Sequence, residues 1–250
     1  MSALNRIGTP FIELLTVEST NNYAMGLVRA GMAQHGAAVF THQQTWGRGQ
    51  RNREWLSQGG RNIAMSIVIE PNGLPPLEPF LLSMMTAVAV HDLCSDHLDD
   101  EIKIKWPNDI YWRDRKAAGI LIENVWQGNE WKVAVVGIGI NVNQTDFGEL
   151  EGKAVSFKEI AGKELEPLRL AKQLCNIMEQ QFQLLITDSS VIVERYTAHL
   201  YKLNEMVKLK KQNRVFEAAI RDVSRSGELI VSHALEERFR VGEVEWLNGG

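Results

Sequence analysis

The stretch Gly119-Ile120-Leu121-Ile122-Glu123-Asn124-Val125-Trp126 is followed, after Gln127-Gly128-Asn129, by a second apolar run from Trp131 to Val142. Both runs are rich in the β-branched and aromatic residues that favour strands. The polar, glycine-containing segment between them is typical of a hairpin loop. This stretch therefore predicts two consecutive strands joined by a hairpin, and strands joined by so short a loop pair antiparallel.

Further strand and helix patterns lie on both sides of this hairpin. Ser19-Thr20 offers a hydroxyl cap to a helix that follows it, and Pro167 stands where another helix would begin. We expect other strands over Phe11–Leu15, Ala37–Phe40, Asn62–Ile69, Ile102–Trp106 and Ile110–Trp112. We expect further helices over Leu77–Leu98, Leu168–Ile186 and Val191–Leu203.

The pattern changes after residue 203, where helical periodicity ends. Short strand candidates follow at Val207–Leu209, Phe216–Val223, Glu228–Val231 and Glu243–Trp246. A tail of this length suits a small barrel of the SH3 kind. The sequence therefore predicts an α+β protein, with a mixed, mostly antiparallel sheet flanked by helices in residues 1–203 and a small SH3-like β domain in residues 204–250.

Composition limits the classes to which the chain can belong. The 250 residues are 44% hydrophobic and 23% charged, with a formal net charge of -4, as in an ordinary soluble globular protein. There is no long uncharged apolar run and no signal-peptide core at the start, so we expect a cytoplasmic protein that does not enter a membrane. Cys94 and Cys175 are expected to be buried thiols, and the six histidines show no metal-ligand spacing.

The segment Gly47-Arg48-Gly49-Gln50-Arg51-Asn52-Arg53-Glu54-Trp55, here called the basic loop, concentrates positive charge in an acidic protein. Glycine permits close backbone approach, and arginine presents a planar fork that fits phosphate and carboxylate. The charge is local, which favours a small anionic ligand over a nucleic-acid polymer. A dinucleotide-binding loop is the weaker alternative, because no helix pattern opens after it. A solvated surface loop is the other alternative.

Three later segments carry similar signals. Lys105-Trp106-Pro107-Asn108-Asp109 presents a lysine, an amide and a carboxylate around a turn, a set that could hold a phosphate and its magnesium. Lys116-Ala117-Ala118-Gly119 places a lysine before small residues at a strand start, and Gly137-Ile138-Gly139-Ile140-Asn141 puts glycines inside a strand, which indicates a close approach or a bulge. Taken singly, each segment is also compatible with an ordinary turn, strand or bulge.

The ordered set resembles the catalytic domain of biotin protein ligases, which has a class II aminoacyl-tRNA-synthetase-like fold. The resemblance rests on Glu18-Ser19-Thr20-Asn21, Gln44, Gly47-Arg48-Gly49, Trp55, Lys105–Asp109, Lys116–Leu121, Gly139-Ile140-Asn141 and the tail up to Gly242-Glu243-Val244. It implies a two-step reaction. Biotin and ATP form biotinyl-5′-adenylate and pyrophosphate, and a lysine of a biotin carboxyl carrier domain then takes the biotinyl group and releases AMP.

The resemblance also implies roles for individual residues. Catalysis would fall to Lys116, Arg48 and Lys105, and a magnesium contact to Asp109. Biotin would be bound by Ser19, Thr20, Asn21, Gln44, Gly47, Arg48, Gly49, Gln50, Lys116, Gly119 and Gly137. The nucleotide would be bound by Arg48, Arg51, Trp55, Lys105, Asn108, Lys116 and Asn141. Many family members have arginine where Gln50 stands and glycine where Asn52 stands; Gln50 keeps a hydrogen-bonding group but lacks the charge, so the resemblance assigns the ligand contact to its backbone.

Some members of this family carry an N-terminal winged helix and act as repressors. Because the first strand is expected by Phe11, the sequence predicts the ligase-only form, without sequence-specific DNA binding, as a monomer or homodimer. Two alternatives stay open. One is a lipoate ligase or octanoyl transferase of the same broad fold, although Cys94 and Cys175 lie away from every motif. The other is a non-catalytic sensor of biotin or nucleotide.

Overall fold

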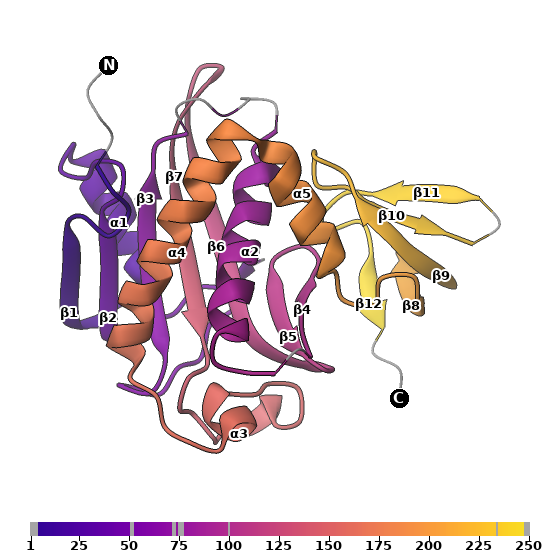
Figure 1. Ribbon diagram of the computed structural model, residues 1–250, viewed down its shortest axis with the longest axis horizontal. Helices are drawn as coiled ribbons and strands as arrows, with labels where there is room; N and C mark the ends of the chain where they lie inside the picture. The colour runs from indigo at the N-terminus through magenta and orange to yellow at the C-terminus, as the bar shows by residue number, and fades with distance from the viewer. Residues whose placement is uncertain are drawn as a thin grey trace.

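A seven-stranded sheet forms the centre of the larger part of the molecule (Figure 1). The computed structural model describes residues 5–50, 53–71, 74, 78–99, 101–233 and 235–247. The strand order is β1-β2-β3-β7-β6-β5-β4, and only β1 and β2 pair in parallel. The predicted mostly antiparallel sheet is thus confirmed. Its strands are β1 Phe11–Val17, β2 Ala38–Gln44, β3 Ile63–Ile69, β4 Ile102–Lys105, β5 Asp109–Trp112, β6 Arg115–Gln127 and β7 Glu130–Ile140.

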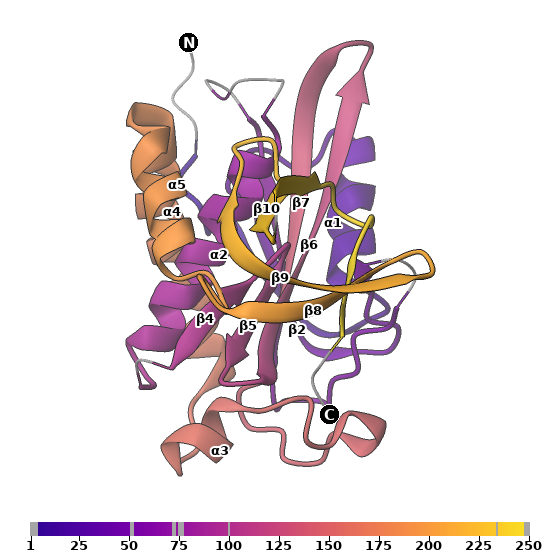
Figure 2. The ribbon, with the colours of Figure 1, turned by 90° about the vertical axis from the view of Figure 1, so that its right-hand side faces the viewer.

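Helices cover both faces of this sheet (Figure 2). Helix α1 (Thr20–Arg29) contacts β2, β3 and β7 on one face. On the other face α2 (Phe80–Ser95) contacts β4, β5 and β6, and α4 (Pro167–Thr187) contacts β2 and β3, while α5 (Ser189–Ala198) packs on α2 and α4. Helix α2 is apolar on all sides because it lies between the sheet and the two later helices.

Strand alternation decides which side chains meet which helix layer. Val68 and Val135 lie in the small cluster under α1, whereas their neighbours Ile67 and Val136 lie in the main core with α2 and α4. The same alternation places Gly137 and Gly139 on the α1 face, two and four residues beyond Val135. This face therefore continues from a packed cluster under α1 to a glycine-lined surface at one end of the sheet.

The smaller part of the molecule is a five-stranded antiparallel sheet in the order β11-β10-β9-β8-β12, as expected for the C-terminal β unit. One of its strands, β11, has no counterpart among the strands expected from the sequence. The two parts share one hydrophobic cluster, and Trp106 Nε1 donates a hydrogen bond to the carbonyl oxygen of Gly227 at 3.0 Å. The strands are β8 Met206–Lys211, β9 Arg214–Val223, β10 Leu229–Ser232, β11 Glu236–Phe239 and β12 Glu245–Leu247.

Several element boundaries differ from those expected. Helix α5 ends at Ala198 because the next residues pair with the free edge of β4, where Ile104 N–H donates to His199 O at 2.8 Å and Tyr201 N–H donates to Ile104 O at 2.8 Å. The short helix α3 (Phe157–Ala161) was missed, although Ser156 forms a capping box at its start. A further turn of 3₁₀ helix spans Gly148–Leu150. Across the part of the chain that the structure describes, no helix is long and apolar enough to span a membrane.

Candidate active site

An open cavity lies on the α1 face, where α1 begins and the strands present glycines. The cavity brings together residues from the basic loop and from the three later motifs, although Asn141 at the end of the last motif does not line it. Its lining consists of Ser19, Thr20, Asn21, Gln44, Arg48, Gly49, Gln50, Trp55, Ala64, Met65, Asn108, Lys116, Gly119, Ile120, Leu121, Gly137, Ile138 and Gly139.

The first wall is the N-terminus of α1, with neutral polar side chains fixed by hydrogen bonds. Ser19 is the N-cap, as predicted, and its Oγ accepts a hydrogen bond from Asn22 N–H. Thr20 donates to Gln44 Oε1 from its backbone N–H at 2.8 Å and lies with its Oγ1 3.1 Å from the same oxygen. This orients the Gln44 amide, whose Nε2 has no acceptor within the described part of the chain. The wall therefore offers ready-placed donors and acceptors to a polar, uncharged ligand group.

Asn21 is held beside β7, and Gly137 makes room for it. Its Oδ1 lies 2.6 Å from the hydroxyl of Ser66, and its Nδ2 donates to the carboxylate of Glu123 at 2.9 Å and to Leu121 O at 3.4 Å. A Cβ on Gly137 would lie 2.2 Å from Asn21 Oδ1. Gly137 thus marks a close approach, and the alternative of a bulge is wrong because β3 and β7 stay in register through this residue.

Trp55 covers the next glycines along the floor. A Cβ on Gly139 would lie 2.4 Å from Trp55 Cε2, and one on Gly119 would lie 3.1 Å from Trp55 Cζ3. The indole is positioned by the basic loop, where Trp55 N–H donates to Gly47 O at 2.9 Å and Gly49 N–H donates to Arg53 O at 2.7 Å. Trp55 Nε1 is buried and has no partner among the described residues, so it could donate to a ligand. Residue Arg51, predicted to contact the nucleotide, lies outside the described residues.

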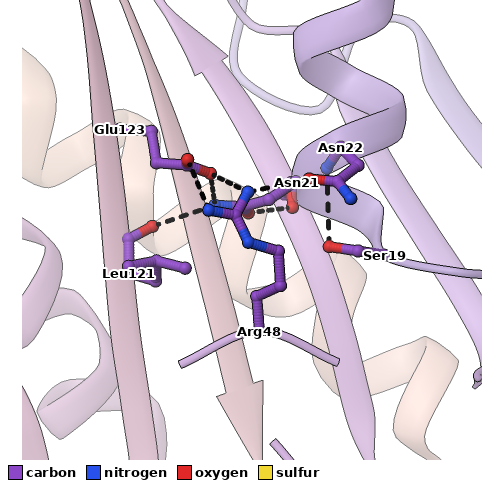
Figure 3. Close-up of polar contacts among 7 residues, drawn as sticks. Ser19, Asn21, Asn22, Arg48, Leu121 and Glu123 are labelled. Atoms are coloured by element: carbon purple, nitrogen blue, oxygen red, sulfur yellow. Dashed lines mark hydrogen bonds and ion pairs between the residues drawn. The ribbon is translucent and has the colours of Figure 1, made fainter. Parts of the chain in front are cut away.

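Arg48 lines the cavity and extends from the basic loop toward Glu123 and the start of α1 (Figure 3). Its guanidinium pairs with Glu123 through Nη1 at 3.1 Å and Nη2 at 3.0 Å, and Nη1 also donates to Asn22 Oδ1 at 2.7 Å. Glu123 was not among the predicted site residues. Alternation along β6 could have found it, because it shares a face with Gly119 and Leu121.

Lys116 lines the cavity from β6. It was expected before the strand, but β6 begins at Arg115. A register shift between Ile110 and Tyr111 of β5 leaves Ala117 as an extra residue in β6. Such a bulge redirects side chains. The Lys116 ammonium lies 2.7 Å from Asp109 Oδ1 and 5.6 Å from the centre of a Trp55 ring.

Lys105 does not line the cavity. Its ammonium lies 4.3 Å from the ring centre of Tyr111 and 5.3 Å from those of Tyr201 and Trp246, at the junction with the C-terminal sheet. Burial lowers the pKa of Lys105, an effect opposed by the nearby charge of Asp109. Lys105 is therefore an electrostatic neighbour of the Lys116–Asp109 pair and contributes positive potential there.

Two other predicted residues stand beside the cavity. Asn141 Nδ2 donates to the backbone oxygens of Lys116 at 3.3 Å and Val155 at 3.2 Å, so in this structure it fixes the strand segment that carries Lys116. Asp109 Oδ1 is buried and receives no well-directed hydrogen bond from the described residues, although the Lys116 ammonium is close. The described residues contain no cluster of three acidic, histidine or cysteine side chains that could hold a metal by itself.

The cavity combines features that the sequence had placed in separate motifs. Twelve of its lining residues were predicted, and Gly47 adjoins it through its backbone contact with Trp55. The predicted site residues did not include the Ser66 hydroxyl behind Asn21, the residues Asn22 and Glu123, or six strand residues of the lining, which are Ala64, Met65, Ile120, Leu121, Ile138 and Gly139. Cys94 and Cys175 are buried in α2 and α4, on the opposite face of the sheet. The α1 face, where the cavity lies, therefore holds no cysteine thiol of the kind that the transferase alternative would need.

Comparison with known proteins identifies the family. The signature of the biotin/lipoate A/B protein ligase family matches residues 14–141, just over half of the chain. The chain is 33% identical over 154 residues to the bifunctional ligase/repressor BirA of Bacillus subtilis (strain 168), a match covering 60% of this chain and 47% of that protein. It is 34% identical over 155 residues to the biotin–[acetyl-CoA-carboxylase] ligase of Paracoccus denitrificans, covering 60% of this chain and 62% of that protein. The chain thus matches only about half the length of the first of these relatives.

Two solved structures have a similar fold. A biotin protein ligase from Aquifex aeolicus in complex with biotin and ATP superposes with a TM-score of 0.81 at 23% identity, covering 96% of this chain and 99% of that chain. A biotin protein ligase from Leishmania major in complex with biotinyl-5-AMP gives a TM-score of 0.64 at 25% identity, covering 96% and 98%. With the signature spanning the α1 wall, the basic loop, Lys116 and the glycine strand, the chain belongs to the biotin/lipoate A/B protein ligase family.

Proposed function

We propose that this protein attaches biotin to a lysine of a biotin carboxyl carrier domain, using ATP and passing through biotinyl-5′-adenylate. The observation that carries the proposal is one cavity with a neutral polar wall at the start of α1 and two cations, Arg48 and Lys116, along its other sides. The names of the relatives support biotin as the substrate, and the Paracoccus relative supports a carboxylase as the partner. Both structural relatives were solved with ligands of this reaction.

The polar wall suits the ureido ring of biotin. That ring presents one carbonyl acceptor and two N–H donors and carries no charge. Gln44 Nε2 and the Ser19 hydroxyl can donate to the carbonyl, and Asn21 Oδ1 retains a lone pair beyond the one facing Ser66. Because both Asn21 N–H groups are already engaged, Asn21 serves as an acceptor for a ring N–H.

The charged side of the cavity suits adenylation. The biotin carboxylate oxygen attacks the α-phosphorus of ATP and pyrophosphate leaves, so negative charge must be held while two anions meet. Arg48 and Lys116 supply fixed positive charge within the cavity, and Lys105 adds positive potential from outside it. The carrier lysine amine then attacks the acyl carbon and AMP leaves. Neither step needs a protein nucleophile, so positioning is the main task of the chain.

ATP is expected to enter with magnesium, which usually takes one or two protein carboxylates together with phosphate oxygens. Asp109 fits one such contact because its buried Oδ1 receives no well-directed hydrogen bond, although this oxygen also forms the ion pair with Lys116. When bound, the ion would neutralise phosphate charge. Asp109 already orients the Lys116 ammonium at 2.7 Å, and this contact holds Lys116 along the cavity side. Trp55 and Asn108 flank the same end and could contact the nucleotide.

Biotin-dependent exchange of pyrophosphate into ATP tests the proposal. Lys116→Ala should lower the kcat of this exchange by about 100-fold or more, as removal of a transition-state charge contact does. The Kd for biotin, measured without nucleotide, should change little because the polar wall is untouched. Lys132→Ala, which removes a lysine paired with Glu130 at the hairpin end, is the matched control and should exchange normally.

The same assay separates the alternatives. Exchange that depends on lipoate or octanoate instead of biotin would replace the proposed substrate. Tight binding of biotin with no exchange under any condition would favour a sensor. Normal exchange by Lys116→Ala would remove Lys116 from the proposed role while leaving the substrate assignment in place. Transfer to a purified biotin carboxyl carrier domain, followed by mass spectrometry, tests the partner.

A further inference from the structure

We propose that Glu123 is a positioning residue that holds Arg48 over the cavity and ties it to the α1 wall. The inference rests on the proposed function for its consequence and on contacts within the chain for its geometry. Glu123 receives Arg48 through both carboxylate oxygens and Asn21 through Oε2 at 2.9 Å (Figure 3). One carboxylate thus joins three elements: β6, the basic loop and the start of α1.

The location of Glu123 separates it from the ligand-contacting residues. It lies opposite Val135 in the β6–β7 pairing, one step along the cavity face from Leu121. Leu121 lines the cavity, whereas Glu123 does not. Arg48 does line the cavity. Glu123 therefore binds the guanidinium from a position outside the lining, while the arginine side chain borders the cavity. An arginine with five N–H donors can keep this grip and still offer N–H groups to an anion.

The energetics favour orientation over large stabilisation. The side chain of Glu123 is 26% exposed and that of Arg48 is 40% exposed, so water weakens their attraction. The two parallel N–H···O contacts nevertheless fix the plane of the guanidinium, which a single contact would not. Asn22 Oδ1, at 2.7 Å from Nη1, fixes it from a third direction. Arg48 is therefore placed before any ligand arrives.

Asn21 gives this arrangement a second consequence. The same Glu123 oxygen that accepts from Arg48 also accepts from Asn21, which lies in the wall proposed to hold the ureido ring. Movement of the carboxylate therefore loosens the basic loop and removes one of the three contacts that hold Asn21 in the wall. We expect Glu123 to matter most when biotinyl-5′-adenylate is bound, because Arg48 is the cation that the proposed function assigns to its phosphate and Arg48 lines the cavity.

Hydrogen exchange of the loop amides tests the geometric part without any ligand. In Glu123→Gln the carboxylate charge and one acceptor oxygen are lost. The amides of Gly49 and Trp55, which donate within the loop, should then exchange about threefold faster, as loss of a half-exposed ion pair predicts. Glu164→Gln weakens exposed ion pairs with Arg61 at 3.0 Å and Lys158 at 2.8 Å, outside the cavity lining, and should leave both amides unchanged. Unchanged exchange in Glu123→Gln would overturn the positioning role.

Release of preformed biotinyl-5′-adenylate tests the functional part. Glu123→Gln should release it about threefold faster, while the Kd for biotin alone changes less than twofold, because Asn21 keeps its contacts with Ser66 and Leu121. Glu123→Ala should lose most of its effect on adenylate release in an Arg48→Ala background, because only its contact with Asn21 then remains to be removed. Faster amide exchange with unchanged adenylate release would overturn the link to the reaction. If the wild-type protein forms no adenylate, the proposed function fails, and the amide exchange still decides the geometry.

Discussion

The substitution Gly137→Ala adds one methyl group at the most confined point of the cavity wall. The new Cβ would lie 2.2 Å from Asn21 Oδ1 and 2.8 Å from its Cγ. To reach even 3.0 Å from Oδ1, the Asn21 side chain or the strand must shift by roughly 0.8 Å, because carbon and oxygen cannot overlap this closely. That side chain is fixed by Ser66, Leu121 and Glu123, so it cannot move without stretching hydrogen bonds.

Overpacking of this kind costs about 1–3 kcal/mol, and each weakened buried hydrogen bond about 1 kcal/mol. We therefore expect Gly137→Ala to lower the free energy of unfolding by about 2–3 kcal/mol, or the Tm by roughly 4–12 °C for a chain of this size. Urea unfolding followed by circular dichroism measures the first quantity and calorimetry the second. Isothermal titration should show weaker binding of biotin, because Asn21 lies in the proposed ureido site.

Two control variants test whether the contact with Asn21 causes the loss of stability. Gly26→Ala makes the same chemical change inside α1, where nothing lies within 4 Å of the new Cβ, and should raise stability by about 0.5–1 kcal/mol. Asn21→Ala removes the atoms that the methyl group meets, so Gly137→Ala should cost far less in that background. Wild-type stability for Gly137→Ala alone, or an equal cost with and without the Asn21 side chain, would refute the reasoning.

Three further outcomes follow from the structure. Burial lowers the pKa of His199 to about 4 from 6.5, assisted by the neighbouring charge of His91, so the unfolded chain binds the proton more readily. Stability should therefore fall as pH falls from 6.5 to 4, by about 1–2 kcal/mol after allowance for partial exposure, and His199→Gln should flatten this part of a urea-midpoint profile. Burial raises the pKa of Cys175 to about 12 and that of Cys94 well above its usual range, so Ellman's reagent at pH 8 should titrate neither thiol in the native protein and both after unfolding in guanidinium; fast reaction of the native protein would contradict the burial. Lys105→Met keeps the aliphatic packing but loses the contact between cation and rings, and should lower the free energy of unfolding by about 1 kcal/mol; an unchanged urea midpoint would show that the rings do not stabilise the ammonium.

Local sequence signals predicted most of the fold. Runs of apolar, β-branched and aromatic residues predicted every strand of the seven-stranded sheet and all strands of the C-terminal sheet except β11, and the Ser19 hydroxyl predicted the start of α1. The misses have local causes. Helix α3 is only five residues long, and its capping box was the one signal available. The end of α5 was placed too late because the apolar pattern continues into residues that pair with β4 instead.

For the candidate site, too, local sequence signals predicted some features and missed others. Glycine, arginine and lysine motifs are contiguous in sequence, so their chemistry could be recognised before the fold was known, and twelve predicted residues do line one cavity. Lys105 and Asn141 belong to the same motifs but stand outside the lining, because their side chains engage aromatic rings and backbone oxygens. Sequence spacing does not reveal which partner a long or amide side chain will choose.

The sequence by itself determined the class of fold, the family resemblance and the kinds of group that the site contains, because turns, caps and strand alternation depend on neighbours along the chain. Only the tertiary structure decided that Glu123 holds Arg48, that Asp109 holds Lys116 and that Gly137 yields space to Asn21. Asn21 and Glu123 are 102 residues apart and Arg48 and Glu123 are 75 apart. Contacts over such separations exist because the strands and α1 are packed against each other, and packing is a property of the whole chain.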